Sequence, residues 1–332
     1  METLNTLPLQ AIVPIELDGQ RLDRALSLLF SDYSRSCLQT CVRQQQVLVD
    51  TKVASRTRDR VQTGQRICLT PPAMHTPTRW EAQPIQLEII YEDDDLLIIN
   101  KPAGLVVHPA AGHPDQTLVN ALLHHAPALS ELPRAGLVHR LDRETSGLLA
   151  VAKTRVAHTA LVRQLEERQM QRRYLAVVQG RLITGGHIDL PIGRHPILRQ
   201  KQAVTPINSK TAITDYRVIE RFRQHTRLQI QLTTGRTHQI RVHMAHLRYP
   251  VIGDPLYGGR LQIPAPAFKG CEASAALIQR LRQLKRQALH AHTLGFTHPV
   301  TQTYHTWEAP IPQDIQQLLD CLRADHAQVP SF

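Results

Sequence analysis

The sequence contains no long apolar run, and this absence argues against a membrane-spanning protein. Purely apolar stretches such as Leu96–Ile99 are only a few residues long, whereas a transmembrane helix needs about 20 apolar residues. The N-terminal region carries Glu2 and Glu16 instead of a basic segment followed by an apolar one. We therefore expect no secretory leader, no membrane partner and a cytoplasmic location.

Cysteine is scarce, and its spacing fits neither a disulfide framework nor a metal site. The five cysteines are scattered over 332 residues, and Cys37 and Cys41 have no second cysteine pair or histidine cluster nearby. There are 18 histidines, but none follows the H-E-x-x-H spacing of zinc ligands. We expect reduced thiols, no metal and, since no cofactor motif occurs, no cofactor.

Acidic residues are outnumbered by basic ones. Asp plus Glu number 28 and Lys plus Arg number 39, so the formal net charge is 39 − 28 = +11. This surplus favours a polyanionic partner, because neutralising phosphates releases their counterions. Charge alone does not separate a nucleic acid from an anionic membrane surface.

The most informative stretch is residues 136–154, GLVHRLDRETSGLLAVAKT. Leu137 and Val138 are typical of the end of one strand, and Leu148–Ala152 is typical of a second, buried strand. We expect a tight polar turn between them that ends at Gly147, because glycine tolerates the backbone reversal. Such a turn would present Asp142 at the sheet edge, which suits a catalytic carboxylate.

Several interpretations of this turn are compatible with the residues alone. Asp142, His139 and Ser146 could form a hydrolase triad, but all three fall on one turn and no G-x-S-x-G motif occurs. A kinase loop would read His-Arg-Asp, whereas Leu141 intervenes here and no Gly-rich phosphate loop is present. A purely structural turn with a local His139–Asp142 hydrogen bond also stays open.

Residues 139–147, HRLDRETSG, resemble the H-R-L-D-x-x-T-S-G signature of RluA-type pseudouridine synthases. The resemblance implies that Asp142 is the essential catalytic residue and that Arg140 fills the place of a base that has left its stack. His139 is a further candidate for base flipping or RNA contact. The implied reaction is the isomerisation of uridine in RNA. The N1–C1′ bond breaks, the uracil rotates, and C5 rejoins C1′, so the target nucleotide must be flipped out.

Four further segments resemble motifs of the same family, and they occur in the same order. They are NKPAGLVVHP at 100–109, RRYLAVVQG at 172–180, PIGRH at 191–195 and GRTHQIRVH at 235–243. The resemblance implies that Tyr174 stacks on the uracil or takes a proton from it, and that Arg241 pairs with Asp142. Such an arginine would keep the carboxylate ionised and oriented.

Other basic residues of these motifs are candidate RNA contacts. Lys101 and His108 could contact phosphate or could only shape their loop. We expect residues 191–210 to be loops that grip the RNA backbone. The remaining candidates in this group are Arg194, Arg236 and His238.

The N-terminal region predicts a small separate domain. Leu22, Ala25, Leu26 and Leu29 have helical spacing, Ser34 can cap a second helix, and residues 47–49 and 66–69 are typical of short strands. The unit resembles an S4 RNA-binding domain, whose Arg-Leu-Asp opening matches residues 21–23, although Gln46 and Asp50-Thr51 replace its usual glycine and Asn-Gly turn. The candidate RNA contacts, which could also be a solvated basic face, are Arg21, Arg24, Arg35 and Arg43.

The predicted fold is α+β, with a catalytic domain built on a large mixed, mostly antiparallel sheet and a small S4-like domain. We expect a loose arm at 1–12, the S4-like domain at 13–72 and a proline-punctuated linker at 73–84. The catalytic domain follows at 85–318 and a frayed tail at 319–332. Within the catalytic domain, we expect helices capped by Thr117, Thr154 and Thr237, and a helix at 275–286.

Residues 287–292 and 307–314 resemble the subfamily that modifies large-subunit ribosomal RNA. The resemblance implies a 23S rRNA or pre-50S substrate, with loop uridines of a stem-loop at the subunit interface as targets. We expect a monomer that does not act on DNA. Two other classes stay open, namely a non-catalytic RNA-binding or ribosome-assembly protein and a hydrolase that uses Asp142 and His139.

Overall fold

The computed structural model describes residues 8–30, 35–70, 80–110, 112–259, 263 and 273–328, without the side chains of 35–37. It divides the chain into two units, residues 1–79 and 80–332, each with its own apolar core. Residues 80–84, predicted as linker, therefore belong to the second unit. Residues 73–79 of that predicted linker lie outside the described part.

The first unit packs two helices against a four-stranded antiparallel sheet of order β1-β4-β2-β3. The apolar sides of the helices, including Leu22, Leu26 and Leu38, form a core with Ile67 and Leu69. Its elements are β1 (Leu9–Ile12), α1 (Leu22–Leu29), α2 (Arg35–Arg43), β2 (Val47–Val49), β3 (Lys52–Val53) and β4 (Arg66–Leu69), with a 3-10 turn at Ile15–Leu17. The predicted helices and the two predicted strands are confirmed, whereas Ser34 lies outside the described residues.

The prediction of a loose arm over 1–12 is wrong for its last residues. Leu9–Ile12 form β1, which pairs with β4 in the register Leu9↔Leu69 to Ile12↔Arg66. The strand lies at a sheet edge and is mostly exposed, so it lacks the alternating apolar pattern that would have identified it. Residues 1–7 lie outside the described part.

The second unit is built on a nine-stranded sheet of order β5-β6-β7-β15-β8-β14-β13-β9, with β16 paired to β15. Its ladders are antiparallel except that of β7 with β15, which confirms the predicted mixed, mostly antiparallel sheet. The strands are β5 (Ile89–Glu92), β6 (Leu96–Lys101), β7 (Ser146–Ala152), β8 (Gln171–Gln179), β9 (Gly186–Asp189), β13 (Ile213–Arg221), β14 (His225–Leu232), β15 (Leu289–Thr297) and β16 (Tyr304–Glu308).

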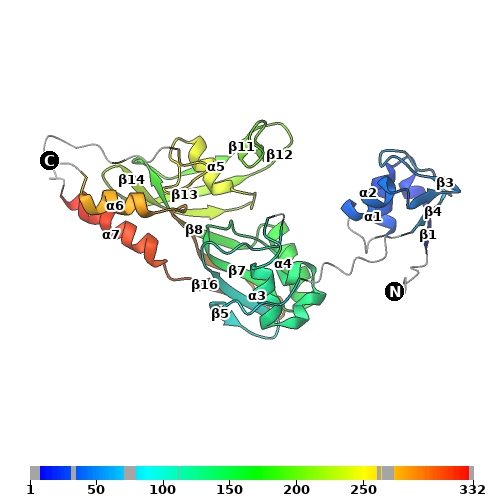
Figure 1. Ribbon diagram of the computed structural model, residues 1–332, viewed down its shortest axis with the longest axis horizontal. Coiled ribbons are helices and arrows are strands. Elements are labelled where there is room, and N and C mark those ends of the chain that lie inside the picture. The colour runs from blue at the N-terminus through cyan, green and yellow to red at the C-terminus, as the bar shows by residue number, and fades with distance from the viewer. Residues whose placement is uncertain are drawn as a thin grey trace. The chain divides into compact units, whose positions relative to one another are not determined.

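Helices cover both faces of this sheet. The strands carry apolar side chains on both faces, and each face must be buried. In β6, Leu97 and Ile99 join one core while Leu96 and Ile98 join another. Figure 1 shows α4 next to β7, and α6 packed beside α7. The helices are α3 (Leu118–His125), α4 (Arg155–Glu166), α5 (Gln239–His246), α6 (Ala275–Gln283) and α7 (Gln313–Ala327).

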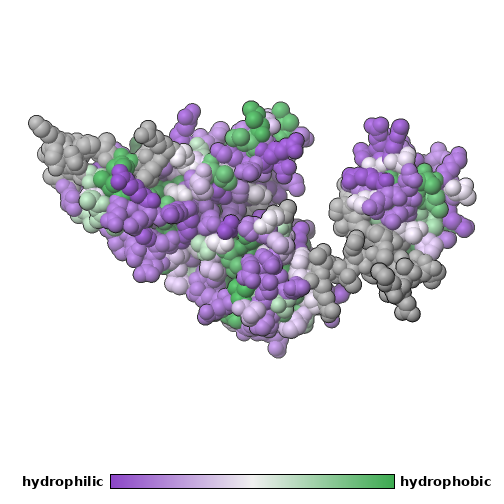
Figure 2. Space-filling view, viewed as in Figure 1, coloured by the Kyte–Doolittle hydropathy of each residue, from purple (hydrophilic) through white to green (hydrophobic). Residues whose placement is uncertain are grey.

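Two segments are more ordered than predicted. Residues 191–210 are not only loops, since β10 (Ile192–Arg194), β11 (Gln202–Val204) and β12 (Ser209–Lys210) form a small sheet. Figure 2 shows an apolar patch over this region, whose exposed apolar residues are Ile197, Leu198 and Ile207. The predicted tail from 319 belongs to α7, where Leu319 and Leu322 are buried.

The expected helix caps are confirmed at two of three positions. The Thr154 hydroxyl accepts a hydrogen bond from Ala157 N, and Thr117 forms a reciprocal capping box with Asn120. The cap of α5 is His238, in a left-handed conformation with φ 58°, and not Thr237.

The expected strand end at Leu137–Val138 is also wrong. Leu137 makes only a single bridge to Val151, because the 3-10 helix η3 (Pro133–Gly136) precedes it directly.

Candidate active site

Asp142 lies on the loop that joins η3 to β7, and this loop is anchored from several sides. Thr145 N donates to the Asp142 carbonyl at 3.0 Å, and Gly104 N donates to the Arg143 carbonyl at 2.9 Å. The Asp142 side chain stays 17% exposed. A reactive carboxylate is thereby presented from a rigid base.

Lys101 also holds this loop, through hydrogen bonds from its side chain to backbone carbonyls. Its side chain is 1% exposed, and its Nζ donates to the carbonyls of Pro102, Leu105 and Arg143 at 2.7, 3.0 and 2.9 Å. Burial lowers the pKa of Lys101 to about 7, while the charges of Glu144 and Asp142 favour its protonated form. Of the two predicted roles, the geometry therefore supports loop shaping and not phosphate contact.

Arg241 on α5 pairs with Asp142, in the arrangement that the family motif implies. Its Nη1 lies 2.9 Å from Asp142 Oδ2. The opposite edge of the guanidinium is held by Asp254, with Nε–Oδ2 at 2.6 Å and Nη2–Oδ1 at 3.0 Å. Burial alone would lower the pKa of Arg241, but the two carboxylates outweigh it and raise that pKa.

The turn after Asp254 completes the surroundings of this ion pair. Asp254 Oδ1 also accepts hydrogen bonds from Leu256 N and Tyr257 N. The Tyr257 ring lies 5.0 Å from the Arg241 guanidinium carbon, and its hydroxyl is 2.9 Å from His238 Nδ1. His238 Nε2 in turn lies 3.9 Å from Asp142 Oδ1. Only one oxygen of Asp142 is thus tightly held, and the other faces the pocket.

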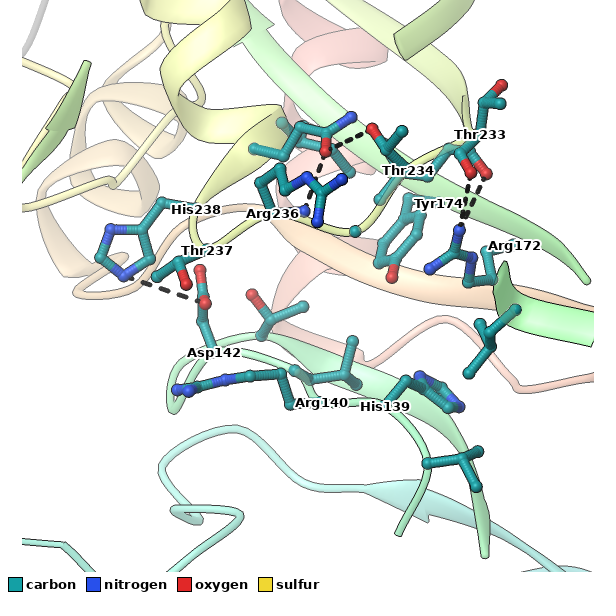
Figure 3. Close-up of a pocket in the computed structure, with 18 of the residues that line it drawn as sticks. His139, Arg140, Asp142, Arg172, Tyr174, Thr233, Thr234, Arg236, Thr237 and His238 are labelled. Atoms are coloured by element: carbon teal, nitrogen blue, oxygen red, sulfur yellow. Dashed lines mark hydrogen bonds and ion pairs between the residues drawn. The ribbon is translucent and has the colours of Figure 1, made fainter. Parts of the chain in front are cut away.

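A pocket of about 740 Å³ opens in front of Asp142 (Figure 3). Tyr174 of β8 lines it with its side chain mostly buried. Burial raises the pKa of the Tyr174 phenol, an effect that the nearby charge of Arg172 partly offsets. The phenol is therefore protonated at neutral pH, with its ring at the pocket wall.

The hydrolase interpretation of the signature does not fit the geometry. The Ala150 N–H donates to His139 Nε2 at 3.0 Å, and Ser146 Oγ is paired with His290 Nδ1 at 3.0 Å. Burial, reinforced by the charge of Arg172, lowers the pKa of His139 to about 3. His139 is thus a neutral structural group of the loop and not a partner of Asp142.

The other predicted pocket residues are brought together, with one exception. His108, Arg140, Arg236 and His238 all line the pocket. Burial, together with the charges of Arg134 and Arg140, lowers the pKa of His108 to about 4. Arg194 is exposed on β10 and does not line the pocket.

The candidate arginines of the first unit whose side chains are described, Arg21, Arg24 and Arg43, are exposed. Arg21 Nε donates to Asp23 at 3.1 Å, with its side chain 55% exposed. The side chain of Arg35 lies outside the described residues. The exposure of Arg21, Arg24 and Arg43 fits either predicted role, an RNA contact or a solvated basic face.

Sequence reasoning missed several residues that shape the pocket. Asp254 and Tyr257 lie in a glycine-rich segment whose sequence gave no sign of contact with Arg241. Arg172 is buried in the pocket beside Tyr174, and it was visible only as the basic position of the tyrosine motif. Arg134 and Arg168 also line the pocket, both at positive φ, 55° and 61°. Six arginines in all face this pocket, opposed there by Asp142 and Glu166.

The described part of the chain presents neither a metal-ligand cluster nor a membrane span. Within the described ranges, no group of three or more His, Cys, Asp or Glu side chains is arranged to hold a metal ion. Among the helices of those same ranges, none combines the length and apolar character needed to span a membrane.

Comparison with known proteins gives one consistent family. Residues 95–246 match the RNA pseudouridylate synthase family. Ribosomal large subunit pseudouridine synthase D of Pseudomonas aeruginosa is 52% identical over 95% of this chain and 96% of its own length. The protein of that name from Escherichia coli K12 is 50% identical over 92% of each chain. The human RNA pseudouridylate synthase domain containing 4 structure has the same fold, with TM-score 0.55 and 24% identity over 71% of this chain and 93% of its own.

Proposed function

Since the chain belongs to the RNA pseudouridylate synthase family, we propose that it isomerises specific uridines of 23S ribosomal RNA to pseudouridine. The family makes it an isomerase. The observation that carries the proposal is the state of Asp142, with one carboxylate oxygen held by Arg241 at 2.9 Å and the other directed into an arginine-lined pocket. A carboxylate held in this way is oriented through one oxygen and keeps the other available to react.

The reaction needs a group that acts at the glycosidic bond and a site that holds the detached uracil. Asp142 supplies the first, acting at C1′, at the base or on the ribose 2′ proton. Tyr174 supplies part of the second, since its ring forms the pocket wall. Because its phenol is protonated at neutral pH, stacking on the uracil is favoured over proton abstraction. Arg241 orients Asp142.

The flipped-out conformation requires a group that replaces the target base in its stack. Arg140 is exposed, lines the pocket and lies two residues before Asp142. His108, Arg236 and His238 line the same opening, where they can contact the flanking backbone. We infer that Arg140 fills the vacated position.

The ribosomal substrate is inferred from the relatives, whose names specify the large ribosomal subunit. We expect a stem-loop at the subunit interface, reached as 23S rRNA or a pre-50S particle. The first unit, with its two helices, four-stranded sheet and exposed arginines, would add affinity for RNA as an S4-like domain. We infer that the protein acts as a monomer in the cytoplasm.

The test is a pseudouridine map of 23S rRNA from a strain that lacks the protein, complemented with wild type, Asp142→Asn or Asp115→Asn. Asp115 is an exposed carboxylate outside the pocket, so it controls for loss of one negative charge. We expect a few sites to disappear and to return with wild type and Asp115→Asn only. An unchanged map in the deletion strain would contradict the ribosomal assignment.

A further inference from the structure

One buried cation in the pocket has no anionic partner. Arg172 is 7% exposed, and in the part of the chain that the structure describes no carboxylate pairs with it. Its Nη2 donates to the Thr233 carbonyl at 3.2 Å, while its buried Nε has no hydrogen-bond partner. A buried charge without a counterion is costly, and Arg241, in the same pocket, has two carboxylates. The unused donors of Arg172 therefore call for a ligand.

The Arg172 guanidinium lies close to the backbone of Gly235. A Cβ atom on Gly235 would lie 2.8 Å from Arg172 Nη1, a distance at which one of the two groups would have to move. Gly235 has no positive φ that would explain a glycine there. A side chain at position 235 would therefore meet the guanidinium of Arg172 in its present position.

Arg172 lies where the far edge of a bound base would reach. Arg172 and Tyr174 are two residues apart on β8, so they share a face of the sheet, and the charges of both Arg172 and Asp142 act on the Tyr174 phenol. In Figure 3, Tyr174 is drawn between Asp142 and Arg172. A uracil stacked on Tyr174 with its C1′ at Asp142 directs its carbonyl edge toward Arg172.

We propose that Arg172 is a catalytic residue that donates hydrogen bonds to the O4 edge of the flipped uracil and stabilises the negative charge of the departing base. The proposal rests on the proposed function. When N1–C1′ breaks, the bonding pair goes to N1 and its charge is shared with O2 and O4. The C5 carbon then donates an electron pair to C1′, the C5 proton leaves to a base, and N1 gains a proton, so no atoms are lost overall.

The same contact selects uracil over cytosine. A guanidinium has only donors, and cytosine presents an amino donor where uracil presents the O4 acceptor. Burial lowers the pKa of Arg172, the Tyr174 phenol favours its charged form, and the cation Arg236 disfavours it. None of the ion pairs among the described residues involves Arg172, so no carboxylate takes the place of the substrate. The ligand that completes this site is therefore an acceptor that becomes anionic during the reaction.

The test compares Arg172→Gln with Arg173→Gln in the full chain, by single-turnover pseudouridine formation in a 23S rRNA stem-loop at saturating enzyme. Arg173 is the next residue of β8 and lies on its other face, so it controls for the loss of one charge from this strand. We expect Arg172→Gln to slow the reaction by about 10²–10³-fold, as removal of one oxyanion donor does. Arg173→Gln should react at the wild-type rate, and the RNA Kd of Arg172→Gln should change little.

Two further measurements separate catalysis from a structural role. Replacing O4 by sulfur in the target uridine should slow the wild type and leave the Arg172→Gln rate unchanged. The thermal midpoint of Arg172→Met should be no lower than that of the wild type, because an unpaired buried charge has been removed.

A wild-type rate in Arg172→Gln would overturn the role of Arg172. So would a lower thermal midpoint of Arg172→Met together with a proportionate loss of activity. Neither result would contradict the proposed function. A wild type that forms no pseudouridine would instead contradict the proposed function.

Discussion

The guanidinium of Arg241 is shared between two carboxylates, and this division decides how Asp142 is held. Asp254 takes the Nε and Nη2 donors, so Asp142 receives a hydrogen bond only from Nη1. Without Asp254, the guanidinium could rotate and grip both oxygens of Asp142. Asp254 therefore keeps one oxygen of the catalytic carboxylate available.

We predict that Asp254→Asn loses both stability and activity. Asp254 and Arg241 are 0% and 5% exposed, and removing one partner of a buried pair costs about 3–5 kcal/mol. The rate should fall on the order of 100-fold, the effect of a misplaced reacting group. Urea unfolding and single-turnover kinetics measure the two effects.

The matched control is Glu220→Gln, which removes a carboxylate from the two-pronged Arg323–Glu220 pair. Those side chains are 40% and 30% exposed, so the free energy of unfolding should change by less than about 1 kcal/mol. Equal losses of stability in both variants would contradict the role given to Asp254.

The residues of the site divide into those that a motif can identify and those that only a contact can. Asp142, Tyr174 and Arg241 fall in contiguous motifs, and the structure brings them to one pocket. Asp254 and Tyr257 act through contacts with a helix that precedes them in the chain, and nothing in their own segment indicates that contact. Lys101 was ambiguous because its burial, which decides its role, is not readable from the sequence of its motif.

Gly147 shows how an element can depend on one missing side chain. It was expected at the reversal of the turn, but it lies inside β7 with φ 117°. A Cβ there would be 2.3 Å from the Ala291 carbonyl of β15. The absence of a side chain at Gly147 allows β7 and β15 to approach closely. These two strands form the one parallel ladder of the sheet as described.

We predict that Gly147→Ala destabilises the second unit by clearly more than the about 1–2 kcal/mol of a left-handed backbone alone. The strands would have to separate, and the loop that carries Asp142 ends at the start of β7. Gly104→Ala is the matched control, since Gly104 has φ 88° but no atom within 4 Å of its added Cβ. Urea unfolding should show a distinctly smaller loss for Gly104→Ala, and similar losses would exclude the strand contact as the cause.

Elements with a clear apolar pattern were predictable, such as α1 with its helical spacing and β6 with its continuous apolar run Leu96–Ile99. The strands β13, β15 and β16 were not predicted, and neither were several short ones. The edge strand β1 is largely exposed, and β10, β11 and β12 are two or three residues long, so neither has a readable period. The helix α7 was not predicted, since its residues were divided between the end of the catalytic domain and a frayed tail. It packs against α6, a contact between separate segments.

The second unit carries buried histidines that make its stability depend on pH. His225 and His290 are 2% and 0% exposed, and burial lowers the pKa of each to about 4. In the unfolded chain these two histidines bind protons below about pH 6.5. In the folded chain they do so only below about pH 4. Each histidine should therefore lower the free energy of unfolding by about 1.4 kcal/mol per pH unit between pH 6.5 and 4.

Urea unfolding at several pH values tests this prediction with two variants. His225→Gln removes one of the buried groups and should flatten the pH dependence by about one proton. The control His113→Gln removes an exposed histidine and should leave the slope unchanged. A slope that His225→Gln does not alter would show that acid acts on other groups.

The two units have separate cores, so their contributions to function are separable by truncation. The core of the first unit is formed by residues 13–69 alone, and those of the second unit by residues beyond 79. We predict that residues 80–332 fold and modify a naked stem-loop at saturating concentration, because the whole pocket lies in this unit. RNA affinity should fall, and the dependence of log Kd on log salt should weaken by about 0.7 for each phosphate that is no longer neutralised.

The full chain with Arg24→Gln and Arg43→Gln should reproduce part of that change if the exposed arginines bind RNA. An unchanged Kd and salt slope in the truncated protein would contradict an RNA-binding role for the first unit.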